Sequence, residues 1–517
     1  MALSTLSALI TIGGALIYPA VTGFVLPNLT VTPSIEDRSA SHHIPLEIGN
    51  PFVDGWYADP DTAIYDGRYW VFPTTSRPYE EQTYFDAFSS PDLIHWTKHP
   101  TILNITDIRW AYKALWAPAS VSRNGKYYLY FSANDLQEDE EAAGLEGGIG
   151  VAVADRPEGP YRDAIGQPLI GNYYNGAQPI DQDVFIDNTT QAYIYYGGHG
   201  HANVAKLNDD MVSIGWFDDQ KQYIEITPKG YVEGPQMFKR NGKYYFTWSE
   251  GGWTGPDYAV SYAMGFHPTG PFSLADKILQ QDDAVARGSG HNGIFNVPDT
   301  DIWYMVYHRR PLSENDPNHR VLAYDRMYFF ADTESIKPVK MLVRDNFRDG
   351  NMLGWKTFGG NWTVEGYQIT DLDHSGESRA MLDTNFGDLV FDATITLGDV
   401  SGDAGLIFRS LGLDRGETGF TGYYASFSGA GAITLEKAES GRWSVIARTT
   451  TEVELEKEYE VRVTAIGHEI QIYMGASTEP RIIAEDHTYG TGSTGVGIRG
   501  TKALFGDISV SRPSESV

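Results

Sequence analysis

At 517 residues the chain is too long for one ordinary domain, and its length predicts two or three domains. Its 68 acidic residues outnumber its 39 basic ones and give a formal charge of −29. This balance argues against nucleic acids and anionic membranes as partners, because both carry negative charge, and favours neutral substrates. The absence of cysteine excludes disulfides, thiolate catalysis and cysteine metal sites. We expect a monomer.

The first 23 residues are mostly apolar but form too short a stretch for a comfortable membrane span. We therefore expect a signal peptide over residues 1–23 and a leader over 24–44, with a membrane anchor or a frayed tail as the alternatives, since no Lys or Arg precedes Arg38. Asn-x-Ser/Thr sequons at Asn28, Asn104, Asn188 and Asn361 agree with secretion. The expected localisation is extracellular.

Residues 45–340 repeat one pattern five times, a polar turn followed by a short aromatic strand. The turns begin at Asp66, Asn124, Asp187, Asn241 and Asp299, in steps of 58, 63, 54 and 58 residues. Such a period, with Asn-Gly or Asp-Gly before aromatic strands, is typical of propeller blades. The sequence therefore predicts a five-bladed β-propeller, whose central channel is a natural place for a recessed active site.

After residue 340 the strands lengthen into alternating apolar and polar patterns, as in 389–395 and 469–473. About nine to eleven such strands over roughly 170 residues predict a two-sheet β-sandwich from 341 to 517, with one face of each sheet buried. The chain is thus expected to be all-β, with very little helix.

Three acidic residues, Asp59, Asp181 and Glu233, lie in settings unlike those of ordinary surface carboxylates. Each is flanked by aromatic or aliphatic residues and by Pro or Gly, and each precedes the aromatic strand of a different blade. A buried carboxylate is costly unless it is paired, so such placement usually serves a function. Equivalent positions on different blades converge on one axis. Asp66, Asp92 and Asp187, by contrast, are best interpreted as turn residues.

Inverting hydrolysis of a glycoside requires one carboxylate to deprotonate water and one carboxylic acid to protonate the leaving oxygen. A third carboxylate near the acid raises its pKa and keeps it protonated. The three predicted acids suit this chemistry. A lectin built on a propeller would not need them, which disfavours a non-catalytic carbohydrate-binding protein.

The propeller region resembles glycoside hydrolase family 43 over about residues 50–332. The resemblance rests on five motifs in order: Tyr57-Ala58-Asp59-Pro60-Asp61, Leu115-Trp116-Ala117-Pro118, Pro179-Ile180-Asp181, Val232-Glu233-Gly234-Pro235 and Gly290-His291-Asn292-Gly293. It implies that Asp59 is the general base and Glu233 the general acid. Asp181 is then the residue that modulates the pKa of the general acid and helps to orient it. Relatives commonly have Pro where this chain has Gln182, and Asp183 remains a lesser candidate.

Four further residues are expected to face the sugar. Trp116 and Trp253 offer indole faces that suit the apolar face of a pentose. The resemblance places His291 at the channel axis, near a calcium or similar small ion, although a hydrogen-bonded core histidine is the default. It also directs Arg326 at the substrate, with an ion pair to Asp325 or a neighbouring acid as the alternative. Trp70, Trp96, Trp248 and Trp303 lie in strand-like patterns and are expected in the core.

No cofactor is expected to be required, and no zinc-type histidine cluster occurs; His42 and His43 fall in the leader. Residues 345–347, 359–362, 402–409, 422–424 and 441–443, together with Trp355, resemble the concanavalin-like jelly-roll modules attached to many glycosidases. Such modules bind carbohydrate or brace the catalytic domain, and the sequence leaves both roles open.

The family resemblance implies a secreted, inverting exo-glycosidase acting on plant cell-wall polysaccharides, with α-L-arabinofuranosidase as the preferred activity. A β-xylosidase, an exo-acting galactanase or a galactofuranosidase would use the same acids. The retaining fructan hydrolases share the five-bladed fold, but they need an Asn-Asp-Pro motif and a Glu-Cys pair. This chain has Ala58 before Asp59-Pro60 and lacks cysteine, which disfavours that alternative.

Overall fold

The computed structural model describes residues 48–135, 147–273, 276–374, 376–412 and 419–513, and Leu46–Val517 form one compact unit. The described residues are almost entirely strands and turns; their helical elements are two short 3-10 turns, Tyr79–Glu81 and Ile105–Asp107. None of these described elements is a helix long and apolar enough to cross a bilayer. The expected signal peptide, the leader, Asn28 and the histidine pair lie outside the described residues, so secretion stays a prediction.

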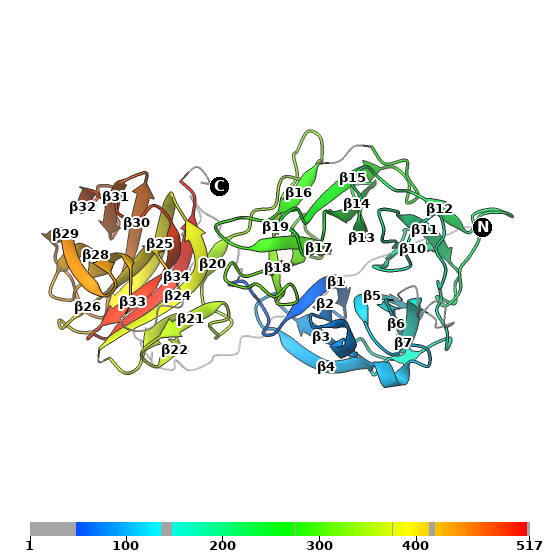
Figure 1. The fold of residues 1–517 in the computed structure, drawn as a ribbon, viewed down its shortest axis with the longest axis horizontal. Coiled ribbons are helices and arrows are strands. Elements are labelled where there is room, and N and C mark those ends of the chain that lie inside the picture. Colours follow the sequence, from blue (N-terminus) through cyan, green and yellow to red (C-terminus); the bar gives the residue numbers. More distant parts are fainter. Residues whose placement is uncertain (1–47, 136–146, 274–275, 375, 413–418, 514–517) are drawn as a thin grey trace, which may run out of the picture. The chain divides into compact units, whose positions relative to one another are not determined.

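The predicted five-bladed propeller is confirmed (Figure 1). The first two blades are β1 (Tyr57–Tyr65), β2 (Arg68–Thr75), β3 (Tyr84–Ser90) and β4 (Thr97–Asn104), then β5 (Trp116–Arg123), β6 (Lys126–Ala133), β7 (Gly148–Ala154) and β8 (Arg162–Asp163). The third and fourth are β9 (Asp183–Ile186), β10 (Ala192–Tyr196), β11 (Asn203–Leu207) and β12 (Tyr223–Glu225), then β13 (Glu233–Arg240), β14 (Lys243–Glu250), β15 (Ala259–Gly265) and β16 (Lys277–Gln280). The fifth has three strands, β17 (Arg287–Asn296), β18 (Trp303–Arg310) and β19 (Val321–Met327).

Each repeated turn leads into the second strand of a blade. Asp66, Asn124 and Asn241 adopt left-handed backbone angles, with φ of 51°, 52° and 49°. Asn and Asp tolerate this conformation, and the following Gly completes a tight turn whose twist matches the strands. The aromatic side chains of the second strands then fill the space between neighbouring blades.

The ring closes between the fifth blade and the segment that precedes the first. The Asn50 side chain donates to the carbonyl of Tyr324 (3.1 Å) and accepts from the Tyr324 amide (3.0 Å), as a neighbouring strand would. The Tyr57 amide donates to the Arg320 carbonyl (2.8 Å). The bond from Tyr57 places the start of β1 beside Arg320, the residue that directly precedes β19.

The predicted β-sandwich is also confirmed (Figure 1). One sheet contains β20 (Val343–Asp345), β22 (Trp362–Glu365), β23 (Gln368–Asp371), β25 (Leu389–Leu397), β30 (Glu458–Ile466), β31 (Glu469–Met474), β32 (Ile482–Glu485) and β34 (Ala503–Ser511). The other contains β21 (Trp355–Phe358), β24 (Glu377–Phe386), β26 (Asp403–Ser410), β27 (Gly422–Phe427), β28 (Ala432–Glu439), β29 (Arg442–Thr450) and β33 (Gly492–Arg499).

The expected number of sandwich strands was too low, because the described part of this region contains fifteen. The early strands β20 to β23 have only three or four residues each. So few positions cannot display a period of two, which is why the sequence pattern did not reveal them.

Direct contacts join the sandwich to the fifth blade and its neighbours. Arg512 forms an ion pair with Asp282 (2.5 Å). The side chain of Asp383, on β24, accepts hydrogen bonds from both the amide and the hydroxyl of Ser313, each 2.8 Å long. Ser313 belongs to the segment between β18 and β19, so the sandwich holds a propeller loop in place.

Candidate active site

Five residues in the left-handed backbone region lie at matching levels on the inner strands of the five blades or just before them. They are Asp59 (φ 47°), Ala117 (41°), Asp181 (55°), Gly234 (61°) and His291 (40°). In β1, β5, β13 and β17 the pairing with the second strand shifts register at this level. Four of the five inner strands therefore carry a bulge at the same height, and Asp181 precedes the remaining one, β9.

A bulge turns a side chain out of its regular alternation, and bulges of this kind are common beside active sites. A non-glycine residue with such a backbone costs about 1–3 kcal/mol, so four in one ring represent considerable strain. Asp59 and His291 occupy the bulges themselves, and Asp181 lies two residues before β9. Trp116 and Glu233 come directly before the bulges of β5 and β13. The repeat of the fold thus directs the predicted site residues toward one end of the propeller.

The structure brings the three predicted acids together around His291. Its Nδ1 lies 3.4 Å from Oδ1 of Asp59 and 3.8 Å from Oδ2 of Asp181. Glu233 reaches the same place through its neighbour, because the Gly234 amide donates to the Asp181 carboxylate. A side chain at Gly234 would come within 3.3 Å of the His291 ring, so only glycine allows this close approach.

Asp59 is held as an ionised carboxylate. Its burial alone would raise its pKa, but the Arg320 guanidinium, 3.2 Å from Oδ1, together with His308 and His291, lowers that pKa well below its usual range. The Asp59 amide also donates to Nδ1 of His308 (3.1 Å), which fixes the bulge. Burial lowers the pKa of His308 to about 4, so that ring is neutral.

Asp181 and Glu233 have the opposite tendency. Burial and the charges of Glu233 and Asp59 raise the pKa of Asp181 well above its usual value. Burial, with a contribution from the charge of Asp59, raises the pKa of Glu233 to about 7, although a hydrogen bond from the Tyr258 hydroxyl (3.0 Å) opposes the shift. These two acids therefore retain protons near neutral pH.

One ionised carboxylate beside protonated carboxylic acids is the arrangement that acid–base hydrolysis requires. Asp59 is able to accept a proton from water, and Glu233 is able to donate one to a leaving oxygen. Arg320 makes this separation of roles possible, because its charge acts most strongly on Asp59.

Comparison with known proteins agrees with this chemistry. A family model described as "Glycosyl hydrolases family 43" matches residues 48–334, more than half of the chain. The chain belongs to glycoside hydrolase family 43. It is accordingly a glycosidase of an inverting family.

Individual relatives differ in their named activities. The chain is 44% identical over 331 residues to "Beta-D-galactofuranosidase xynD" from Aspergillus niger, covering 62% of this chain and 93% of that protein. It is 28% identical to "Xylosidase/arabinosidase 43A" from Humicola insolens, over 54% of this chain and 97% of the relative. A solved α-L-arabinofuranosidase from Clostridium thermocellum is 31% identical, with a TM-score of 0.46, over 56% of this chain and 95% of that one.

The two tryptophans expected at the sugar site lie beside the acids. The guanidinium of Arg320 sits 4.9 Å from the ring centre of half-buried Trp253. Trp116 donates its indole N–H to Gln82 and packs at 4.9 Å against Tyr79. Trp116 also lies opposite Ser132, whose hydroxyl accepts from the Asp181 amide (3.0 Å). Both indoles thus border the family 43 site.

The tryptophans expected in the core are there. Trp70, Trp248 and Trp303 are buried, and half-buried Trp96 packs at 4.7 Å against Phe52.

The expected role of Arg326 requires correction, because the arginine that reaches the acids is Arg320. Arg326 lies over the rings of Tyr304 and Tyr328, at 5.7 and 5.3 Å. The alternative pairing with Asp325 is not seen either, since the buried Asp325 side chain accepts from Tyr307 (2.7 Å). β19 runs parallel to β17, so its start lies at the site. Arg326 is six residues further on, about 20 Å along an extended strand.

The sequence reasoning also missed His308, Tyr258 and Tyr79. His308 and Tyr258 are buried and stack at 5.7 Å behind the acids. One signal was available for Arg320, because an ionised buried Asp59 needs a cation, and a cation at a strand start on the active side was the candidate to seek. Tyr258 sits in a loop and Tyr79 in a short 3-10 turn, and neither segment shows a comparable pattern.

The lesser candidate Asp183 has a different environment. Burial raises its pKa to about 7, and it accepts a hydrogen bond from the Met237 amide on the next blade (2.8 Å). Asp61 of the first blade likewise accepts a hydrogen bond from the following blade, donated by the Ser120 amide (2.6 Å). In both Asp-x-Asp segments the first acid faces the site and the second joins two blades.

Within the part of the chain that the structure describes, no group of three or more His, Asp or Glu side chains is arranged as a metal site. His291 contacts two carboxylates instead. A calcium ion near His291 therefore stays a prediction drawn from the family resemblance.

Proposed function

We propose that this family 43 glycosidase is a secreted exo-enzyme that releases single terminal furanose residues from polysaccharide side chains, with β-D-galactofuranosides as the first candidate substrate and α-L-arabinofuranosides as the second. The observation that carries the catalytic part is the cluster of Asp59, Asp181 and Glu233 around His291, with one acid ionised and two protonated.

The proposed reaction is a single displacement. Asp59, ionised beside Arg320, removes a proton from water as the water attacks the anomeric carbon. Glu233 gives its proton to the departing glycosidic oxygen, and burial together with the negative charge of Asp59 keeps Glu233 protonated until that step. Asp181 is the third acid of the cluster, and the role proposed for it is to modulate and orient the general acid. The sugar leaves with inverted anomeric configuration, and solvent restores both protonation states.

The choice of substrate rests on the relatives. The galactofuranosidase shares 44% of its residues with this chain, whereas the xylosidase/arabinosidase shares 28%. β-D-Galactofuranose has the ring configuration of α-L-arabinofuranose and one additional exocyclic carbon with its hydroxyl, so the same three acids serve both sugars. A β-D-xylopyranoside presents a six-membered ring and is the third candidate. Arabinofuranosidase, the activity preferred from sequence alone, thus becomes the second choice.

Extracellular action agrees with the apolar residues 1–23 and with the sequons. Asn188 and Asn361 are exposed and open to glycosylation, and Asn104 is half-buried. Plant cell-wall polysaccharides that carry furanose side chains, such as arabinan, arabinoxylan and arabinogalactan, are the proposed partners.

The test is a panel of para-nitrophenyl glycosides, β-D-galactofuranoside, α-L-arabinofuranoside and β-D-xylopyranoside, with the anomeric form of the product followed by NMR. We expect the highest kcat/KM on the galactofuranoside and inverted product. Fastest turnover of the xyloside would contradict the substrate assignment alone. Retained configuration would contradict the mechanism, and no release from any glycoside would overturn the whole proposal.

A further inference from the structure

Tyr258 connects the general acid with the residue that supports the general base. Its side chain is buried, and its hydroxyl donates a hydrogen bond to Oε1 of Glu233 (3.0 Å). Its ring lies nearly parallel to that of His308, with the ring centres 5.7 Å apart and an angle of 11° between the planes. One side chain therefore contacts Glu233 through its hydroxyl and His308 through its ring.

His308 in turn holds both the backbone and the side chain of Asp59. The Asp59 amide donates to Nδ1 of His308 (3.1 Å), and the same nitrogen lies 3.3 Å from Oδ1 of Asp59. His308 is completely buried and has no freedom to follow a moving partner into solvent. A displacement of its ring would therefore move the bulge that presents Asp59 to the site.

Gly290 makes room for the tyrosine ring. A methyl group at this position would come within 2.1 Å of Cε1 and 2.4 Å of Cδ1 of Tyr258, and neither ring atom can bend away. Gly290 of β17 is paired with His308 of β18. The Tyr258 ring thus rests on the backbone of one strand and on the side chain of the next, in a close-packed place that a smaller side chain would not fill.

The hydroxyl of Tyr258 affects the charge of Glu233 as well as its position. A carboxylate accepts a hydrogen bond more strongly than a carboxylic acid does, so this bond lowers the pKa of Glu233, against the effect of burial. The other titratable groups whose charges act on Glu233 or respond to it are Asp59, Asp181, Arg320, Tyr79 and Tyr231. Removing the hydroxyl alone leaves all of these in place.

We propose that Tyr258 is a positioning residue for the hydrolysis: its hydroxyl orients Glu233 toward the leaving oxygen, and its ring, through His308, holds Asp59 toward the attacking water. An inverting enzyme needs its two carboxyl groups at a fixed spacing of roughly 6.5–9.5 Å, with room for water between them. A rigid aromatic side chain that contacts the acid and the support of the base maintains that spacing. This inference rests on the proposed roles of Glu233 and Asp59 and adds the residue that couples their positions.

Two substitutions separate the hydroxyl from the ring. Tyr258→Phe removes the bond to Glu233 and leaves the ring on Gly290 and His308, whereas Tyr258→Leu removes the ring as well. Rates are measured on the para-nitrophenyl glycoside that the parent cleaves fastest and on the methyl glycoside of the same sugar. The methoxy leaving group needs a proton from Glu233, and nitrophenolate needs little protonation.

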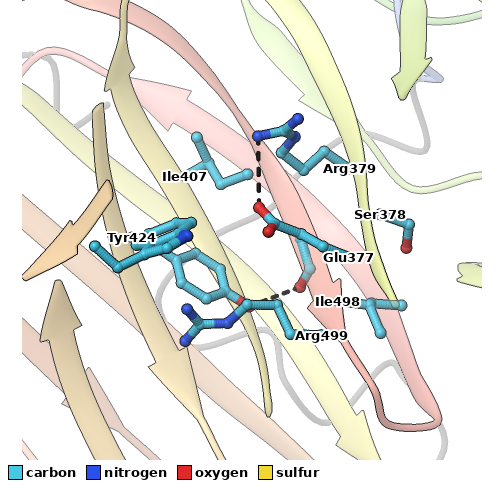
Figure 2. A pocket seen from close by; sticks show the side chains of 9 residues that line it. Glu377, Ser378, Arg379, Ile407, Tyr424, Ile498 and Arg499 are labelled. Atoms are coloured by element: carbon cyan, nitrogen blue, oxygen red, sulfur yellow. Dashed lines mark hydrogen bonds and ion pairs between the residues drawn. The ribbon is translucent and has the colours of Figure 1, made fainter. Parts of the chain in front are cut away.

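Two other tyrosines provide matched controls for the loss of a hydroxyl from a buried ring. Tyr307 precedes His308 on β18, and its hydroxyl donates to Asp325 (2.7 Å). Tyr424 belongs to the sandwich, where its hydroxyl donates to the carbonyl of Gly497 (3.0 Å), as Figure 2 shows. Tyr307→Phe and Tyr424→Phe should leave both rates and the pH profile as in the parent.

We expect Tyr258→Phe to lower kcat on the methyl glycoside by about three- to tenfold with KM nearly unchanged, and to change kcat on the aryl glycoside by less than about twofold. The alkaline limb of kcat/KM on the methyl glycoside should move to higher pH by about one unit, because the lost bond favoured ionised Glu233. Tyr258→Leu should lower kcat on both glycosides by about tenfold or more, because Asp59 is needed for either leaving group.

An unchanged alkaline limb in Tyr258→Phe, or equal losses on the two glycosides, would overturn the role of the hydroxyl. An unchanged aryl rate in Tyr258→Leu would overturn the role of the ring, and equal effects in the control variants would overturn both. Glu233→Gln in the otherwise unaltered enzyme distinguishes these results from a failure of the proposed function. If it loses as much activity on the aryl glycoside as on the methyl glycoside, Glu233 is not the acid, whatever Tyr258 does.

Discussion

The mouth of the propeller and the outer face of the sandwich's seven-stranded sheet carry the same kinds of residues in different ratios of charge. Each region combines acids, arginine and tryptophan on β-strands. In the propeller, bulges interrupt the regular alternation of side chains between the two faces of these strands. At the propeller, Asp59, Asp181 and Glu233 share one arginine, Arg320. At the sandwich, three acids share two arginines: Asp403, Glu436 and Glu377 with Arg499 and Arg379.

The ratio of charges decides what each site does. Surplus acid in a buried place drives proton binding, as the raised pKa values of Asp181 and Glu233 show. Where each carboxylate has a guanidinium partner, the site keeps its charges and offers hydrogen bonds. Proton transfer therefore belongs to the propeller, whereas the acids on the sandwich stay paired with arginine. Substitutions in the two regions test this division.

The largest effect is expected from the acids themselves. Asp59→Asn should lower kcat by about 10²- to 10⁴-fold on every substrate, because it removes the ionised carboxylate that deprotonates water. Glu233→Gln should cause a similar loss on natural glycosides but a much smaller one on para-nitrophenyl glycosides, whose leaving group needs little protonation. Steady-state kinetics on both substrate types make the comparison.

Glu436→Gln is the corresponding change in the sandwich. It should leave kcat near that of the parent on natural glycosides and on para-nitrophenyl glycosides. Equal losses for Glu233→Gln on good and poor leaving groups would remove its assignment as the acid.

Arg320→Met should reduce activity and also displace its pH dependence. Burial raises the pKa of Asp59 and the Arg320 guanidinium lowers it, so removing the guanidinium should raise the pKa of Asp59. The carboxylate must be ionised to act, so the acidic limb of kcat/KM should move to higher pH. In the parent, the alkaline limb should lie near pH 7, because burial places the pKa of Glu233 at about 7.

A pH profile of kcat/KM for parent and variant measures both limbs. Arg326→Met is the matched control, since that arginine packs on Tyr304 and Tyr328. An equal displacement in the control, or none in Arg320→Met, would contradict the role given to Arg320.

The sequence predicted the propeller and its acids well because both depend on local, repeated signals. Turn residues and aromatic strands recur once per blade, and Asp59, Asp181 and Glu233 occur at the same point of that repeat. Arg320 and Arg326 lie on the same short strand region, and only the strand direction shows which one reaches the site. That direction emerges from the pairing of β19 with β18, which no local pattern reports.

The cluster of charged and aromatic side chains on the outer face of the sandwich could not be predicted for a related reason. Glu377, Asp403, Tyr424, Trp443 and Arg499 come from five strands that meet only in the order β24, β33, β26, β27, β28 and β29. Each residue alone looks like an ordinary exposed strand position. Long-range strand order, which turn signals and alternation do not specify, brings them together.

A smaller effect is expected where the two regions touch. Asp383 on β24 holds Ser313, and Arg287 donates to the carbonyls of Leu312 and Glu314 in the same loop, which leads to Arg320. Asp383→Ala should loosen this loop and lower kcat/KM by about three- to tenfold. Asp383→Asn, whose amide oxygen still accepts from Ser313, should restore most of the activity. No loss in Asp383→Ala would show that the propeller positions Arg320 unaided.

The smallest expected effect concerns stability and pH. An acid whose pKa is raised by folding contributes stability that is present below its unfolded pKa of about 4 and lost as the pH rises through the folded value. Asp181 and Glu233 have raised pKa values, that of Glu233 being about 7, so the unfolding temperature should fall as the pH rises from about 4 to about 7.

Asp181→Asn removes one of these titrations and should reduce that fall by a few degrees, measured by scanning calorimetry. Glu377→Gln changes an acid paired with Arg379 on the sandwich and should leave the fall as in the parent. A larger change from Glu377→Gln than from Asp181→Asn would mean that the surplus of buried acid lies outside the propeller mouth, and the division between the two regions would fail.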